Sequence, residues 1–214
     1  MIAASPADQV LLEIEAQRFA EEVGIPPCPE ILARFAAEMH SADPDMSSKV
    51  AAVASGLATR LKGIEPAAAH TYALFRDCGL PVLMRKFAIY GEVVEANRAK
   101  PGKDLIIVEE NRFRLNHAHV GFALARGWLL PDAMCKSILY HHEPDKLSAF
   151  SRDLEPANPT LVAFGMLAEQ VVALRDERGL CPDWVEHEGF VLETLGLTAG
   201  EVVELALEGE AVAA

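Results

Sequence analysis

The side chains best suited to chemistry lie in three short segments of this sequence. Residues 140–144 read Tyr-His-His-Glu-Pro, His117 and His119 stand earlier, and Arg76 and Asp77 earlier still. Imidazoles and carboxylates are ligands for iron, manganese or zinc, and a dinuclear hydrolase would draw such groups from several helices. Arg76 stands where a further ligand would be wanted, but a guanidinium stays protonated and cannot donate a lone pair. The pattern predicts a metal site that lacks one ligand.

The earlier candidates also have structural roles open to them. Asp77 lies just before Gly79 and suits the C-terminal turn of a helix, and with Arg76 adjacent we prefer that interpretation to ligation. His117 begins a predicted helix and projects in a different direction from His119. A histidine at that position could simply cap the helix or contact the preceding loop.

The later candidates depend on where their helix ends. On a continuous helix His141 and His142 would point about 100° apart, so both could face one point only if the helix ended there. Pro144 is compatible with such an end. Imidazoles at a helix C-terminus also interact well with the helix dipole, so a structural role for the pair stays equally open. Glu143 is predicted to be an exposed acid or a hydrogen-bond partner that orients one histidine, rather than a direct ligand.

Composition excludes several classes of protein. The 214 residues are 51% hydrophobic and 24% charged, which is ordinary for one folded domain. A formal net charge of -13 disfavours a nucleic-acid partner, which needs clustered Lys and Arg, although local basic patches stay open. The four cysteines form no Cys-x-x-Cys pair, so free thiols are expected. With no signal-like N-terminus and no apolar run of about 20 residues, the sequence predicts a cytoplasmic protein without a membrane span.

Apolar residues recur at helical spacing along most of the chain and predict an all-α fold. The expected order is an N-terminal helix in residues 1–24, a helical domain in 25–178 and acidic helices in 179–214. The acidic end is predicted to be a solvated helix face, with an interaction tail as the alternative. Thr198 and Glu201 form a predicted capping box. The expected helices span residues 6–23, 31–39, 47–61, 67–77, 86–99, 105–114, 117–128, 132–142, 156–178, 183–195 and 201–207.

Six segments occur in an order that resembles HDOD domains, the regulatory relatives of the HD-type phosphohydrolases. The resemblance covers residues 25–145 in interrupted form. It implies an HD-domain-like helical bundle of HDOD type, here with an acidic C-terminal helical tail. If a metal is retained, it implies that the ligands are Asp77, His117, His141 and His142. The segments are 25–30 (IPPCPE), 43–46 (DPDM), 74–81 (LFRDCGLP), 117–121 (HAHVG), 128–131 (WLLP) and 138–144 (ILYHHEP).

The sequence departs from that family pattern in two ways. Arg76 replaces the histidine of the HD motif, and no Gly-Tyr-Pro follows His142 and Glu143 as in the cyclic-dinucleotide phosphodiesterase branch. Residues 50–61 also run almost directly into 67–77, so much of the family's N-terminal helical subdomain is expected to be absent.

Three functions follow from these features. The first is a non-catalytic, bacterial-type signal-transduction module without a cofactor, which binds a signalling protein or small ligand through Arg76 and Glu143. The second is a metal-dependent phosphohydrolase or phosphodiesterase of the HD superfamily that keeps one divalent iron, manganese or zinc ion. The third is a scaffold that only self-associates. Because the shortened N-terminal part would leave apolar faces uncovered, we also expect a homodimer, with the Ala-rich segment 47–61 near the contact.

Overall fold

The computed structural model describes residues 46–147 and 156–208, and all regular structure within them is helical. The all-α prediction is therefore confirmed for this part of the chain, including segment 105–108, whose apolar run could have formed a strand. The predicted helices at 6–23 and 31–39 lie outside the described residues. The helices are α3 (Met46–Leu61), α4 (Pro66–Phe75), α5 (Gly79–Lys86), α6 (Tyr90–Asn97), α7 (Gly102–Phe113), α8 (His117–Gly127), α9 (Asp132–Leu139), α10 (Pro159–Arg175), α11 (Pro182–Leu195) and α12 (Ala199–Glu208), with a 3-10 turn, η1, at Pro144–Lys146.

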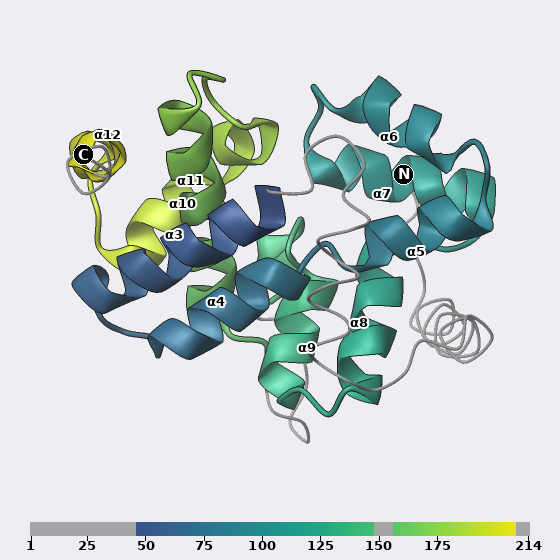
Figure 1. Cartoon of the computed structure of the whole chain (residues 1–214), viewed down its shortest axis with the longest axis horizontal. Helices are drawn as coiled ribbons and strands as arrows, with labels where there is room; N and C mark the ends of the chain where they lie inside the picture. Colours follow the sequence, from purple (N-terminus) through teal and green to yellow (C-terminus); the bar gives the residue numbers. More distant parts are fainter. Residues whose placement is uncertain (1–45, 148–155, 209–214) are drawn as a thin grey trace.

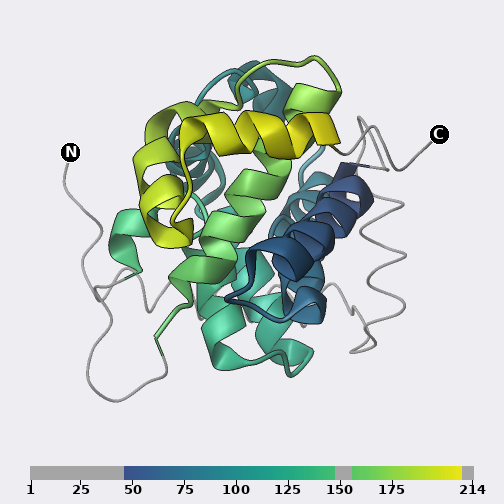
Figure 2. The ribbon, with the colours of Figure 1, turned by 90° about the vertical axis from the view of Figure 1, so that its left-hand side faces the viewer.

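Helix α10 forms the centre of the bundle. It contacts α3, α4, α9, α11 and α12, which surround it in two perpendicular views (Figures 1 and 2). Nearly all of its side chains from Leu161 to Ala173 are buried, as expected for a central helix that is mostly apolar. Asn158 caps its N-terminus by accepting hydrogen bonds from the amides of Thr160 and Leu161. A second group of helices, α5, α8 and α9, packs beside this centre.

The ends of several helices differ from the prediction. The helix expected at 86–99 is present as α6, but it begins only at Tyr90, because the chain is extended at Phe87, directly after the end of α5 at Lys86. Gly79 and Pro81, which follow the helix expected at 67–77, belong to the first turn of α5. A proline is tolerated there, since the first amides of a helix have no intrahelical partner. The capping box is confirmed, because Thr198 and Glu201 exchange side-chain to backbone hydrogen bonds.

The small side chains of α3 are used inside the chain. Ala51, Ala54 and Ala58 are buried, and the helix packs against α4 and α10. The close approach that we expected at a dimer contact is therefore made intramolecularly. The homodimer itself stays a prediction.

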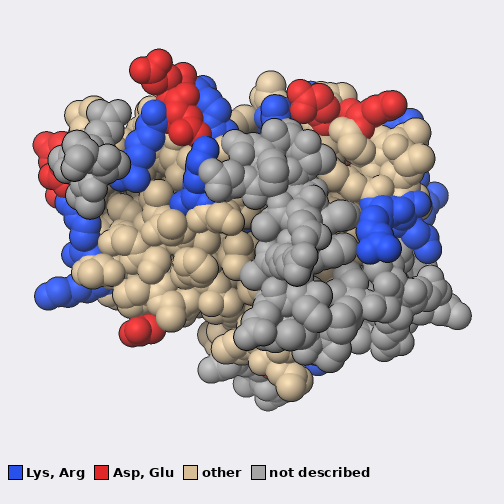
Figure 3. Space-filling model, viewed as in Figure 1, with Lys and Arg blue, Asp and Glu red and all other residues tan. Residues whose placement is uncertain are grey.

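The described surface carries a local basic group despite the negative net charge. Arg85 and Lys86 end α5 and are both exposed. Figure 3 shows Lys and Arg side chains gathered on that side of the molecule.

None of the helices in the described ranges is long and apolar enough to cross a membrane.

A glycine allows the closest approach between α5 and α8. A Cβ on Gly79 would lie 2.0 Å from the carbonyl oxygen of His117 and 3.0 Å from the amide nitrogen of Gly121. We expect Gly79→Ala to lower the free energy of unfolding by about 3 kcal/mol, because backbone atoms cannot move aside cheaply. The matched control is Gly91→Ala on α6, where a Cβ would meet nothing within 4 Å. It should raise stability by about 0.5–1 kcal/mol, and equal effects in urea denaturation would contradict this packing.

Candidate metal centre

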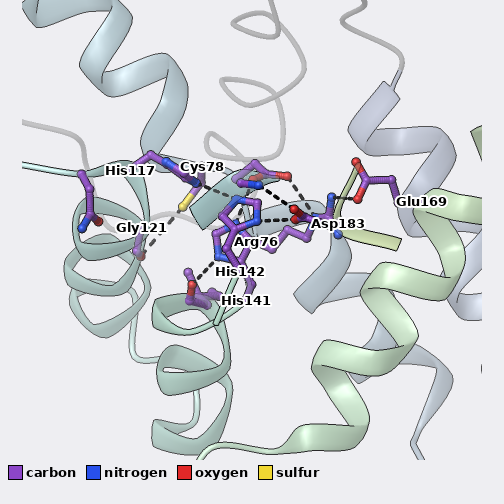
Figure 4. Close-up of polar contacts among 12 residues, drawn as sticks. Arg76, Cys78, His117, Gly121, His141, His142, Glu169 and Asp183 are labelled. Atoms are coloured by element: carbon purple, nitrogen blue, oxygen red, sulfur yellow. Dashed lines mark hydrogen bonds and ion pairs between the residues drawn. The ribbon is translucent and has the colours of Figure 1, made fainter. Parts of the chain in front are cut away.

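Four potential ligands from three parts of the sequence meet where α4 and α9 end and α8 begins. Asp77 follows α4, His117 is the first residue of α8, and His141 and His142 follow α9. One ligand atom from each lies within 4.8 Å of all the others. Figure 4 shows the three imidazoles facing one another. The four residues that the resemblance named as metal ligands are thus brought together.

The end of α9 lets both neighbouring histidines face the same point. The helix stops at Leu139, and Tyr140 already has a non-helical backbone conformation. The ring centroids of His141 and His142 lie 3.9 Å apart, with an interplanar angle of 42°. The condition that the sequence set for a shared site, a helix that ends at this pair, is met.

The Nδ1 atom of each imidazole is held by an acceptor outside the cluster. For His141 that acceptor is the carbonyl oxygen of Ile138, at 2.6 Å. For His117 it is Glu109, whose two carboxylate oxygens lie 2.8 and 3.0 Å from Nδ1. Because a carbonyl or ionised carboxylate can only accept, these contacts place a hydrogen on Nδ1 and leave the Nε2 lone pair for the cluster.

The Nδ1 atom of His142 is also held by an acceptor outside the cluster. Its Nδ1 lies 2.5 Å from Oδ2 of Asp183, whose Oδ1 accepts a hydrogen bond of 2.5 Å from the amide of Gly102. A Cβ on Gly102 would lie 2.0 Å from Nδ1 of His142, so only glycine fits beside this ring.

The inward-facing atoms form a donor set for one cation. Nε2 of His142 lies 3.1 Å from Nε2 of His117, and Nε2 of His141 lies 3.2 Å from Oδ1 of Asp77. With neutral imidazoles these pairs would set lone pair against lone pair, which a proton or a metal ion relieves. Three imidazole nitrogens and one carboxylate oxygen suit zinc and similar divalent ions, and outer hydrogen bonds from Nδ1 are the usual support for such ligands. The residues present therefore fit one cation.

The charge balance around the cluster agrees with this fit. Four carboxylates, from Asp77, Glu109, Glu169 and Asp183, are accompanied by one guanidinium, from Arg76. Burial alone would raise the pKa of Asp77, but Arg76 first and then His141 hold it well below its usual range. With neutral imidazoles the site carries excess negative charge, which a divalent cation would reduce.

Arg76 is turned away from the inward-facing donor atoms. Its Nε donates to Oδ2 of Asp77 at 3.0 Å, and its Nη2 donates to Glu169 on α10 at 2.7 Å. The guanidinium thus occupies the second oxygen of Asp77, while Oδ1 stays with the histidines. Glu169 is thus a second carboxylate partner of the guanidinium, besides Asp77.

The remaining sequence candidates lie outside the cluster. The carboxylate of Glu143 pairs with Lys146 at 2.6 Å, and its predicted role in ligand binding stays a prediction. Nδ1 of His119 donates to Oδ1 of Asn116, the N-cap of α8, at 2.9 Å.

Sequence reasoning missed the residues that support the cluster. Asp183 was expected on a solvated face, which is wrong because it is buried against His142 and Gly102. Glu109 was not singled out, although it follows the buried Ile106 by three residues and so shares the inward face of α7. An acid on an otherwise apolar helical stripe was the available signal. Asp183 had no such signal, since its partner lies 41 residues away.

His119, which is not one of the four cluster residues, gives a further pH dependence. Burial, with smaller effects of Lys146 and His117, lowers its pKa to about 4. A histidine kept neutral on folding contributes stability that is fully present above its unfolded pKa, near 6.5, and is lost as the pH falls towards 4. In chelator-treated protein, we expect wild type to lose about 2 kcal/mol more than His119→Asn between pH 7 and pH 4.5. Equal losses in chemical denaturation would contradict this assignment.

The described residues form an all-helical bundle in which three histidines and an aspartate gather at helix ends. The HDOD domain family profile matches residues 33–144, which is more than half of the chain, so the chain belongs to the HDOD domain family. That family is related to the HD phosphohydrolases. A search of curated proteins found no match.

Two solved structures share the fold. An HDOD domain protein of unknown function from Geobacter sulfurreducens is 22% identical, with a TM-score of 0.54 over 79% of this chain and 59% of the other. A provisionally assigned phosphohydrolase from Shewanella amazonensis SB2B is 20% identical, with a TM-score of 0.54 over 86% of this chain and 61% of the other. The chain thus spans about three fifths of the length of each.

Proposed function

We propose that this chain is a non-catalytic, bacterial-type signal-transduction module, which binds a protein partner or small ligand and holds no more than one divalent cation in a degenerate HD-type site. The contact between Nε of Arg76 and Oδ2 of Asp77 carries this proposal. An aspartate that bridges two cations usually offers one oxygen to each. Here one oxygen accepts from a fixed positive charge, which disfavours a second cation on that side.

The remaining donor set also favours binding without turnover. His117, His141, His142 and Asp77 supply four donor atoms, the usual number in a closed, structural zinc site. Catalytic zinc sites normally keep three protein ligands and one open position. A bound cation would contribute Lewis acidity, but four protein ligands leave little room for a substrate atom to receive it.

The alternative function is a metal-dependent phosphohydrolase that works with one ion. It is favoured by the convergence of the four donors and by the provisional phosphohydrolase assignment of the Shewanella protein. It would require one of the four ligands to leave the ion and make room for substrate.

Hydrolysis assays separate the two functions. Protein loaded with manganese, iron or zinc is incubated with a cyclic dinucleotide and with a nucleotide, beside Asp77→Ala prepared in the same way. We expect no turnover above that of the variant, because Arg76 replaces a ligand and the other donors saturate one ion. Metal-dependent hydrolysis by wild type that Asp77→Ala abolishes would establish the alternative.

A further inference from the structure

The candidate metal centre has a buried extension into helix α6. Tyr90, the first residue of α6, has no exposed surface, and its hydroxyl donates a hydrogen bond to Oε1 of Glu109. Glu109 is also completely buried and holds Nδ1 of His117. A chain of hydrogen bonds therefore runs from α6 through α7 to the first residue of α8.

The hydrogen bonds of Glu109 show what the hydroxyl of Tyr90 contributes. Its carboxylate accepts from the amide of His117 at 3.1 Å, from Nδ1 of the same histidine and from Tyr90. Two of these three donors belong to the residue that Glu109 has to orient. Among the described residues, Tyr90 is the hydrogen-bond donor that holds the carboxylate from elsewhere in the fold.

The ring of Tyr90 is itself held in place. It packs against Phe113 at the end of α7, with ring centroids 5.5 Å apart, and Phe113 packs against Phe87 at 4.7 Å. A fixed phenol directs its hydroxyl at one point, so it can restrict rotation of the carboxylate that it contacts.

We propose that Tyr90 is a positioning residue of the cation site: by fixing Glu109 it holds His117 with its hydrogen on Nδ1 and its Nε2 towards the other ligands. The inference rests on the single-cation site of the proposed function. Removing the outer hydrogen bond of a metal-binding histidine typically costs 10- to 100-fold in affinity. Tyr90 is one hydrogen bond further from the cation than Glu109. We therefore expect Tyr90→Phe to weaken cation binding by the lower end of this range, about tenfold.

The chain offers a matched control for this variant. Tyr72 on α4 is equally buried, and its hydroxyl makes only a long contact of 3.5 Å with the carbonyl oxygen of Ser137. It has no hydrogen bond to a histidine of the cluster or to Glu109. Tyr72→Phe thus removes a buried hydroxyl of the same kind outside the hydrogen-bond chain, and we expect its zinc affinity to equal that of wild type.

The test is a double-mutant cycle read by zinc affinity. The full chain is titrated with Zn²⁺ against a chromogenic chelator as wild type, Tyr90→Phe, Glu109→Gln and the double variant, after circular dichroism has shown that each is folded. Tyr90→Phe should weaken binding about tenfold in the wild-type background. It should weaken binding no further in the Glu109→Gln background, because its effect passes through that carboxylate.

Several results would overturn the proposal. These are unchanged affinity in Tyr90→Phe, an equal loss in both backgrounds, or an equal loss in Tyr72→Phe, because a merely structural role would not depend on Glu109. If Tyr90→Phe does not fold, Phe113→Leu, which loosens the ring and keeps the hydroxyl, enters the same cycle. A loss that vanishes with Glu109→Gln then supports the proposal, and no loss overturns it. Failure of wild type to bind zinc is a different outcome, which removes the cation site of the proposed function.

Discussion

Zinc at about a thousand times its dissociation constant is expected to raise the free energy of unfolding by about 4 kcal/mol. For a chain of this length that corresponds to an increase in Tm of about 8–16 °C. The physical reason is that four donor atoms from three regions of the sequence converge only in the folded state. The measurement is thermal unfolding followed by circular dichroism, with and without zinc, after removal of metals by a chelator.

A pair of histidine variants gives this experiment its control. His117→Ala removes one donor atom and should abolish most of the zinc-induced increase. His70→Ala removes an exposed histidine outside the cluster and should leave it intact. The same increase in His117→Ala as in wild type would mean that zinc acts elsewhere on the molecule.

Replacing Arg76 by methionine is expected to lower the free energy of unfolding by about 3–5 kcal/mol in the metal-free protein. The substitution leaves the carboxylates of Asp77 and Glu169 without their shared guanidinium in a largely buried site. The matched control is Arg60→Met, since Arg60 forms an exposed ion pair with Glu208. Exposed pairs contribute less than about 1 kcal/mol.

Chemical denaturation of the two arginine variants compares the stability cost of losing a buried guanidinium with that of losing an exposed one. A cost for Arg76→Met no larger than that for Arg60→Met would show that the Asp77 and Glu169 contacts contribute little. It would also weaken the view that Arg76 stably occupies the second oxygen of Asp77.

The sequence predicts the fold well where the information is local. The apolar periodicity from residue 105 to 114 places a helix correctly at α7, and the Thr198 to Glu201 capping box marks the start of α12. The break at Phe87 was missed because the turn there contains neither glycine nor proline. Phe87 packs there against Phe113 of α7, a contact between residues far apart in the sequence.

The site was predictable only in part, because many of its contacts join residues that are far apart in the sequence. The ordered motifs identified Asp77, His117, His141 and His142. They did not predict the supporting residues, which come from distant parts of the chain. Glu169 meets Arg76 across 93 residues, a pairing that depends on how α10 packs against α4. Glu169 is therefore a second carboxylate partner of Arg76, besides Asp77.

The number of cations bound per chain tests the central claim most directly. Wild-type protein is saturated with zinc, freed of excess by gel filtration and analysed by inductively coupled plasma mass spectrometry against protein concentration. We expect one zinc per chain, held by the three histidines and Oδ1 of Asp77, because Arg76 occupies the other oxygen. Two zinc ions per chain, with both lost in Asp77→Ala, would show a complete dinuclear site and contradict a degenerate, non-catalytic module.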